Sequence, residues 1–121
     1  MQYALLIYEP PDSFRLTAPP EEQQKIYGEY MQYSRDLQAA GAVRGGAPLQ
    51  TTDTATTVRV RGGEILTTDG PFAETKEWLA GFFLVECATP DEALEWAAKI
   101  PGARYGSIEV RPLMEIGAPT R

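Results

Sequence analysis

The residues best suited to chemistry lie in one short segment, Thr67–Trp78, which combines acids, a base and two aromatic side chains. Asp69 directly precedes Gly70-Pro71 and is the candidate catalytic residue. Its carboxylate can act as a general base or orient a ligand at the mouth of a pocket. It can equally accept hydrogen bonds from nearby backbone N–H groups in an Asx turn. The residue types leave both roles open.

Four further side chains are candidates for binding an anionic or phenolic ligand: Tyr8, Lys76, Glu86 and Arg111. Glu86 ends an apolar strand-like run, where an unpaired carboxylate is costly. We therefore expect an arginine partner for it, Arg111 or Arg59, from a neighbouring strand. The alternative is an arginine that binds an anion inside the fold.

Missing residue types exclude several kinds of site. The chain has no histidine, which rules out Ser-His-Asp and Cys-His catalysis and argues against a zinc site. No metal or cofactor is predicted. The single cysteine, Cys87, cannot form an internal disulfide and is predicted to be a buried, unreactive thiol.

The charge of the chain argues against polyanionic partners. Lys plus Arg is 11 and Asp plus Glu is 17, so the net charge is 11 − 17 = −6. Such a surface repels nucleic acid and anionic membranes. The N-terminal run Tyr3–Tyr8 lacks a basic region before it and is too short for a signal peptide or a membrane span. We expect a cytoplasmic protein.

The periodicity of apolar residues predicts the elements that position these side chains. At 121 residues the chain is expected to form a single domain, 1–121. Proline and acids at 19–22 open a helix that Gly41 closes, and Thr89-Pro90-Asp91-Glu92 caps a second helix. The predicted strands lie at 3–8, 42–49, 56–61, 64–68, 79–87 and 108–111.

A two-glycine turn, Gly62-Gly63, joins two of these strands into a hairpin. Strict alternation before it predicts that Val58 and Val60 face the core while Arg59 and Arg61 face solvent. The order is then β, α, β, an inserted hairpin, β, α, β. This order predicts an α+β, ferredoxin-like two-layer sandwich.

Two strands are apolar on both faces, although the helices of such a sandwich cover only one face of the sheet. These strands are Tyr3–Tyr8 and the one that contains Phe82–Val85. A second copy of the chain is the simplest cover for the other face. The sequence therefore predicts a homodimer with its sheets face to face.

The segment Thr68–Glu77 resembles the signature of DGPF-domain proteins, a bacterial branch of the YCII-related family. The runs at 3–8, 56–61 and 103–112 resemble the family as well, so the resemblance covers residues 1–116. It implies a dimeric α+β barrel, with a pocket that binds or transforms a small anionic or phenolic molecule. In a simpler branch the proposed active site is a His–Asp pair, which this histidine-free chain lacks.

The same resemblance implies an alternative function. Some family members are encoded beside sigma factors of the extracytoplasmic-function type. The chain would then be a non-catalytic regulatory or interaction protein, linked to a sigma-factor pathway.

Overall fold

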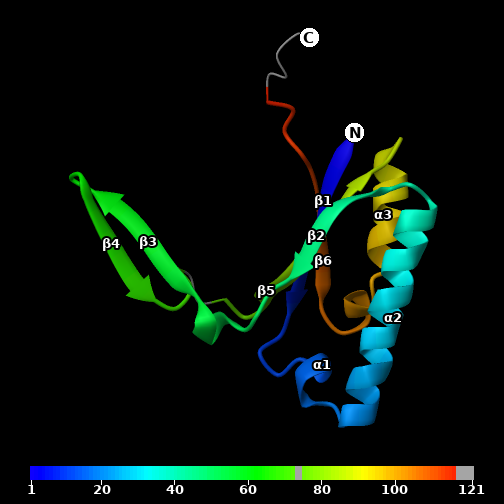
Figure 1. Ribbon diagram of the computed structural model, residues 1–121, viewed down its shortest axis with the longest axis horizontal. Helices are drawn as coiled ribbons and strands as arrows, with labels where there is room; N and C mark the ends of the chain where they lie inside the picture. Colours follow the sequence, from blue (N-terminus) through cyan, green and yellow to red (C-terminus); the bar gives the residue numbers. More distant parts are fainter. Residues whose placement is uncertain (73–74, 117–121) are drawn as a thin grey trace.

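The computed structural model describes residues 1–72 and 75–116. Four strands form one antiparallel sheet, and α2 and α3 lie together against one of its faces (Figure 1). The elements are β1 (Gln2–Glu9), α1 (Phe14–Thr17), α2 (Pro20–Ala39), β2 (Val43–Pro48), β3 (Thr56–Arg61), β4 (Glu64–Asp69), β5 (Trp78–Glu86), α3 (Pro90–Ala98) and β6 (Ser107–Pro112), with single-turn 3₁₀ helices at Thr52–Thr54 and Pro101–Arg104.

The sheet has the strand order β2-β5-β1-β6, and among the described strands β3 pairs only with β4. With the hairpin set aside, this is the topology of a ferredoxin-like sandwich, so the predicted fold class and the inserted hairpin are confirmed. The sheet of one chain is open and does not close into a barrel. None of the described helices is both long and apolar enough to cross a membrane.

The two long helices begin where the sequence predicts. Pro20 opens α2, and Gly41 follows its last turn with a φ of 68°, a conformation that favours glycine. Thr89 caps α3 as predicted, but Glu92 reaches back to the amide before the cap and not to that of Thr89, so only one half of the capping box is present. Thr89 Oγ1 accepts a hydrogen bond from the Glu92 amide at 3.2 Å, and the Glu92 carboxylate accepts one from the Ala88 amide at 2.6 Å.

Alternation along β1 divides the sheet into a helix-covered face and an open face. Tyr3, Leu5, Ile7 and Glu9 are buried on the side of α2 and α3. The residues between them are only half-buried, including Leu6 and Tyr8. The hydrophobic core therefore lies between the sheet and the two helices, with Leu5, Leu37, Val85 and Ile100 fully buried at its centre.

A β-bulge interrupts the pairing of β1 with β5. Ile7 lies opposite Gly81, but Tyr8 lies opposite Leu79, which leaves Ala80 as an extra residue in β5. Glu9 then lies opposite Trp78. Because of the extra residue, Trp78 is on the helix-covered face, where it packs against the core.

The β3–β4 hairpin, residues 56–69, extends away from the body of the molecule, and we call it the arm (Figure 1). Gly62 and Gly63 form its tip with φ values of 57° and 81°, as the two-glycine turn predicts. The prediction that Val58 and Val60 face the core is wrong, because their exposed fractions are 60% and 59%. The hairpin leaves the sheet, so no core lies beneath it.

Candidate functional site

A pocket of about 610 Å³ lies between the helix-covered face of the sheet and α2. Its volume is in the range of small-molecule sites, and its wall is mostly apolar. The lining residues are Ile7, Glu9, Arg15, Leu16, Gln23, Ile26, Tyr27, Tyr30, Met31, Ser34, Gly46, Ala47, Pro48, Ala80, Gly81, Phe82 and Phe83.

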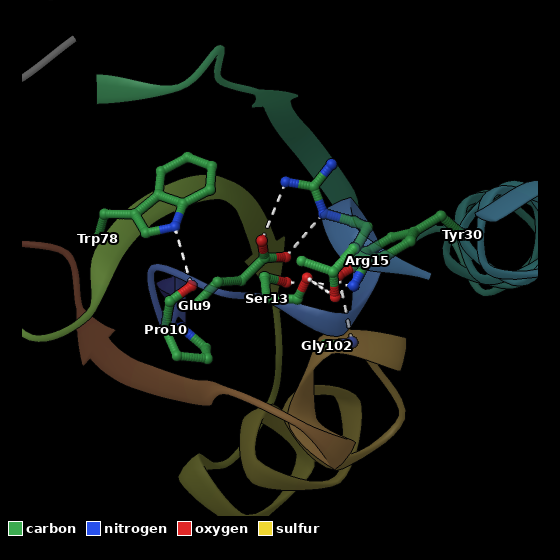
Figure 2. Close-up of polar contacts among 8 residues, drawn as sticks. Glu9, Pro10, Ser13, Arg15, Tyr30, Trp78 and Gly102 are labelled. Carbon is green, nitrogen blue, oxygen red and sulfur yellow. Dashed lines mark hydrogen bonds and ion pairs between the residues drawn. The ribbon is translucent and has the colours of Figure 1, made fainter. Parts of the chain in front are cut away.

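A buried ion pair forms the polar end of this pocket (Figure 2). The Glu9 side chain is 1% exposed, and its two oxygens accept hydrogen bonds from Arg15 Nε at 2.8 Å and Arg15 Nη2 at 3.0 Å. The Glu9 carboxylate holds the pKa of the Arg15 guanidinium above its ordinary value. Two parallel hydrogen bonds fix the orientation of the guanidinium as well as its charge.

The short helix α1 positions Arg15. Ser13 is fully buried and caps α1, since its hydroxyl accepts a hydrogen bond from the Arg15 amide at 3.3 Å. The Ser13 carbonyl also accepts a hydrogen bond from the Thr17 hydroxyl at 3.1 Å. These contacts fold the chain after β1 back over the sheet, so that a side chain six residues along reaches Glu9.

Tyr30 supplies a second polar group to the pocket from α2. Its hydroxyl oxygen accepts a hydrogen bond from the Gly102 amide at 3.2 Å (Figure 2). Burial, with smaller effects of Tyr105 and Glu9, raises the pKa of Tyr30 above its ordinary value. Tyr30 therefore keeps its proton at neutral pH, and within residues 1–72 and 75–116 no acceptor for that proton is found.

Trp78 closes the site on the side of β5. Its indole N–H donates to the Pro10 carbonyl at 3.3 Å, and the Arg15 guanidinium lies 6.0 Å from the centre of its ring. Tyr105 lies on the side of β6. In the part of the chain that the structure describes, its buried hydroxyl has no hydrogen-bond partner, and burial raises its pKa.

The five residues singled out by sequence do not line this pocket. Asp69 is the last residue of β4, exposed at the base of the arm and opposite Thr56. Lys76 is exposed in the segment that returns to β5. The structure describes neither residue 73 nor residue 74, so part of the Thr67–Trp78 segment lies outside the described residues.

The other three residues lie on the open face of the sheet or at its margin. Tyr8 is half-buried there, and Arg111 pairs with Glu109 at 2.6 Å on β6. The Glu86 carboxylate pairs with the N-terminal ammonium of Met1. The expected Glu86–arginine pair is therefore wrong, because Arg111 has its own partner and Arg59 lies on the arm.

Sequence reasoning missed Glu9, Arg15 and the role of Tyr30. The signal for Glu9 was present, since it follows Tyr3, Leu5 and Ile7 at intervals of two and must share their buried face. A carboxylate in that position requires a partner. Arg15 carries no comparable signal, because two prolines precede it and no periodicity predicts α1.

Cys87 is buried, as predicted, and burial raises the pKa of its thiol. It lies outside the pocket.

The fold and the pocket define a ferredoxin-like α+β domain with a small-molecule-sized cavity between sheet and helices. The family model of the YCII-related domain matches residues 1–117. An uncharacterized protein of Rhizobium meliloti (strain 1021) is 41% identical over 115 residues, which cover 93% of this chain and 92% of that protein. The chain belongs to the YCII-related family.

Proposed function

We propose that this YCII-related protein binds a small molecule in the pocket between the sheet and α2. The apolar wall would hold the body of the ligand, and a phenolic or anionic oxygen would accept hydrogen bonds from Arg15 and Tyr30. The observation that carries the proposal is the buried Glu9–Arg15 pair at the end of an apolar cavity.

The cost of burying this ion pair supports a role beyond stability. Taking the Glu9 carboxylate out of water offsets much of its attraction to Arg15, so the pair is weak evidence for a purely structural purpose. Arg15 Nη1 has no acceptor within residues 1–72 and 75–116, and its side chain is 31% exposed. One donor of the pair therefore remains available to a ligand.

The charge of the Glu9–Arg15 pair limits the chemical class of the ligand. Glu9 neutralises Arg15, so the pocket offers oriented donors without a net positive charge. A phenol or a monoanion with an aromatic body suits these donors better than a phosphorylated metabolite.

Thermal shift and calorimetry with p-cresol, benzoate and toluene test the proposal. Ligands that carry the oxygen should raise the melting temperature with concentration, and toluene should have the weakest effect. Tyr30→Phe should weaken binding by about tenfold, the loss of roughly one hydrogen bond. Arg111→Ala, on another surface, is the control.

Two outcomes would contradict the pocket. One is a loss of binding in Arg111→Ala while Tyr30→Phe binds normally. The other is a flat response to all three probes by a well-folded protein. A flat response would favour the alternative function, a regulatory protein whose partner is another protein.

We also propose that the protein is a homodimer in the cytoplasm, with the open faces of two sheets in contact. The open face carries half-buried apolar and aromatic side chains that support this arrangement. The strand register places them together on that face: Leu6, Tyr8, Phe82 and Leu84. Sedimentation equilibrium should give a dimer. Leu84→Arg should shift it to monomer, since a guanidinium group would then be buried among the apolar side chains of the interface.

A further inference from the structure

The arm presents an apolar surface that residues 1–72 and 75–116 leave exposed. Val58, Val60 and Ile65 lie on one side of the hairpin, because Val60 is opposite Ile65 and Val58 is two residues away. Ile65 is 73% exposed, and both valines are more than half exposed. We call these three side chains the apolar side of the arm.

A hairpin of this kind is not expected to remain ordered alone. Two strands without a packed hydrophobic face are at best marginally stable in water. In the described structure β3 pairs only with β4. Hydrogen bonds at the base fix where the arm starts, since the Gly70 amide donates to Ala55 at 2.7 Å and Thr57 donates to Gly70 at 2.8 Å. They leave the apolar side uncovered.

The direction of the arm indicates what covers it. The arm extends on the side of the sheet opposite α2 and α3 (Figure 1). The open face of the sheet looks toward the same side. A second copy placed against that open face would therefore lie beside the arm, within reach of its apolar side.

The charge of the chain excludes polyanions as the occupant of the apolar side. Arg59 and Arg61 lie on the other side of the hairpin from Val58 and Val60, and the chain as a whole carries a net charge of −6. These two arginines therefore point away from a copy that packs on the apolar side. The same net charge disfavours nucleic acid and anionic lipid as the occupant.

We propose that the arm is a clasp that lies along a second copy of this chain, with Val58, Val60 and Ile65 packed against it. The clasp presupposes the sheet-face dimer proposed above and adds a second, separable contact to it. Contacts with the partner copy, and not contacts with the sheet and helices of the same chain, would thus keep the arm ordered.

The segment that leads into the arm starts at the pocket. Pro48, the last residue of β2, lines the pocket, and residues 49–55 lead from it to the arm. On the other side, Trp78, whose ring lies beside the Arg15 guanidinium, begins β5 nine residues after the arm ends. Seating the arm on a second copy would restrain residues 49–55. Ligand affinity should therefore rise with the fraction of dimer.

Hydrogen exchange at several protein concentrations is the direct test on the wild-type chain. Amides of β3 and β4 should gain at least tenfold protection as the dimer forms, together with the outward-facing part of the sheet. Exchange of the arm at the unprotected rate in a fully dimeric sample would overturn the clasp.

Matched variants on the arm separate the clasp from the sheet-face contact. Ile65→Asp places a charge on the apolar side and should raise the dimer dissociation constant at least tenfold. Thr68→Asp, also exposed on β4 but on the opposite side, should change it less than threefold. Circular dichroism confirms folding, which neither exposed substitution should disturb.

These variants distinguish a failure of the clasp from a failure of the sheet-face dimer. If Leu84→Arg dissociates the protein but Ile65→Asp does not, the sheet-face dimer stands and the clasp is wrong. A wild-type protein that is monomeric at all concentrations overturns both. Weakening by Ile65→Asp and Thr68→Asp alike also counts against the clasp, since its contact would then not depend on the apolar side.

Discussion

Glu9 and Arg15 lie face to face at the end of the pocket, joined by two hydrogen bonds of 2.8 Å and 3.0 Å. The two residues are unequally buried, since the side chain of Glu9 is 1% exposed and that of Arg15 is 31% exposed. The buried Glu9 carboxylate therefore depends on Arg15 to compensate its charge. The guanidinium retains access to the pocket and to solvent.

Removal of one partner should destabilise the protein more than removal of both. Arg15→Met leaves a buried carboxylate uncompensated and should lower the free energy of unfolding by about 3 kcal/mol. The double variant Glu9→Leu/Arg15→Met should recover most of that loss. Urea denaturation of both variants measures the coupling.

The exposed Glu109–Arg111 pair is the matched control for this cycle. Its single variants should change stability little, because water replaces the lost partner. Equal effects at the two pairs would contradict the account of Glu9 as a carboxylate that requires Arg15.

Gly102→Ala should damage the pocket through a single methyl group. A Cβ at this position would lie 2.8 Å from the Tyr30 hydroxyl oxygen and 3.3 Å from Ile7 Cγ2. The hydroxyl must then move and lose its bond from the Gly102 amide, which should cost about 1–3 kcal/mol. Chemical denaturation gives the stability, and p-cresol calorimetry gives the effect on the site.

Gly28→Ala is the control for that substitution. Gly28 lies inside α2, and a Cβ there would meet no atom within 4 Å. Alanine should stabilise the helix by about 0.5–1 kcal/mol, because glycine loses more backbone freedom on folding. A stabilising Gly102→Ala would show that Tyr30 is not held as described.

Stability should fall at alkaline pH because the buried tyrosines resist ionisation. The ordinary pKa of tyrosine is 10.0, and burial raises that of Tyr30 well above it. Above pH 10.0 the unfolded chain releases a proton that the folded chain keeps, so each further rise in pH favours unfolding. The contribution is fully present below the unfolded pKa and is lost as pH rises toward the folded one.

Melting temperatures between pH 8 and 11, with tyrosinate absorbance, check this dependence. Tyr30→Phe should make the decline shallower, and Tyr33 and Tyr105 should account for much of what remains, since burial raises their pKa values too. An identical slope in Tyr30→Phe and wild type would contradict a buried, protonated Tyr30.

Asp69→Asn should leave binding of p-cresol in the pocket unchanged. Asp69 is exposed at the base of the arm and does not line the cavity. Lys76→Ala should behave in the same way for the same reason. Calorimetry on both variants beside Tyr30→Phe compares the residues chosen by sequence with those chosen by geometry. A selective loss in Asp69→Asn would extend the site to the arm.

Local rules were sufficient to predict most of the fold. Gly41 ends α2, Thr89 caps α3 and Gly62-Gly63 turns the hairpin, because each feature depends on residues within one turn of chain. The order of these elements then left few topologies to consider. The ferredoxin-like sheet followed from that order.

The site depended on contacts that no local rule describes. Alternation places Glu9 on the buried face of β1, but its partner comes from α1, a helix of four residues after two prolines. The predicted burial of Val58 and Val60 in the arm was wrong for a related reason. Alternation shows that Val58 and Val60 share one side, but it does not show whether a core lies beneath that side.

The bulge at Ala80 has a consequence for comparing relatives of this chain. One extra residue in β5 sends Trp78 to the side of Glu9, whereas an uninterrupted strand would send it to the other side. In a sequence alignment, a one-residue gap between Trp78 and Gly81 therefore moves the tryptophan side chain to the opposite face of the sheet; it does more than shorten the strand. A relative with that gap can have the same tryptophan in its sequence and still have no indole ring beside its arginine.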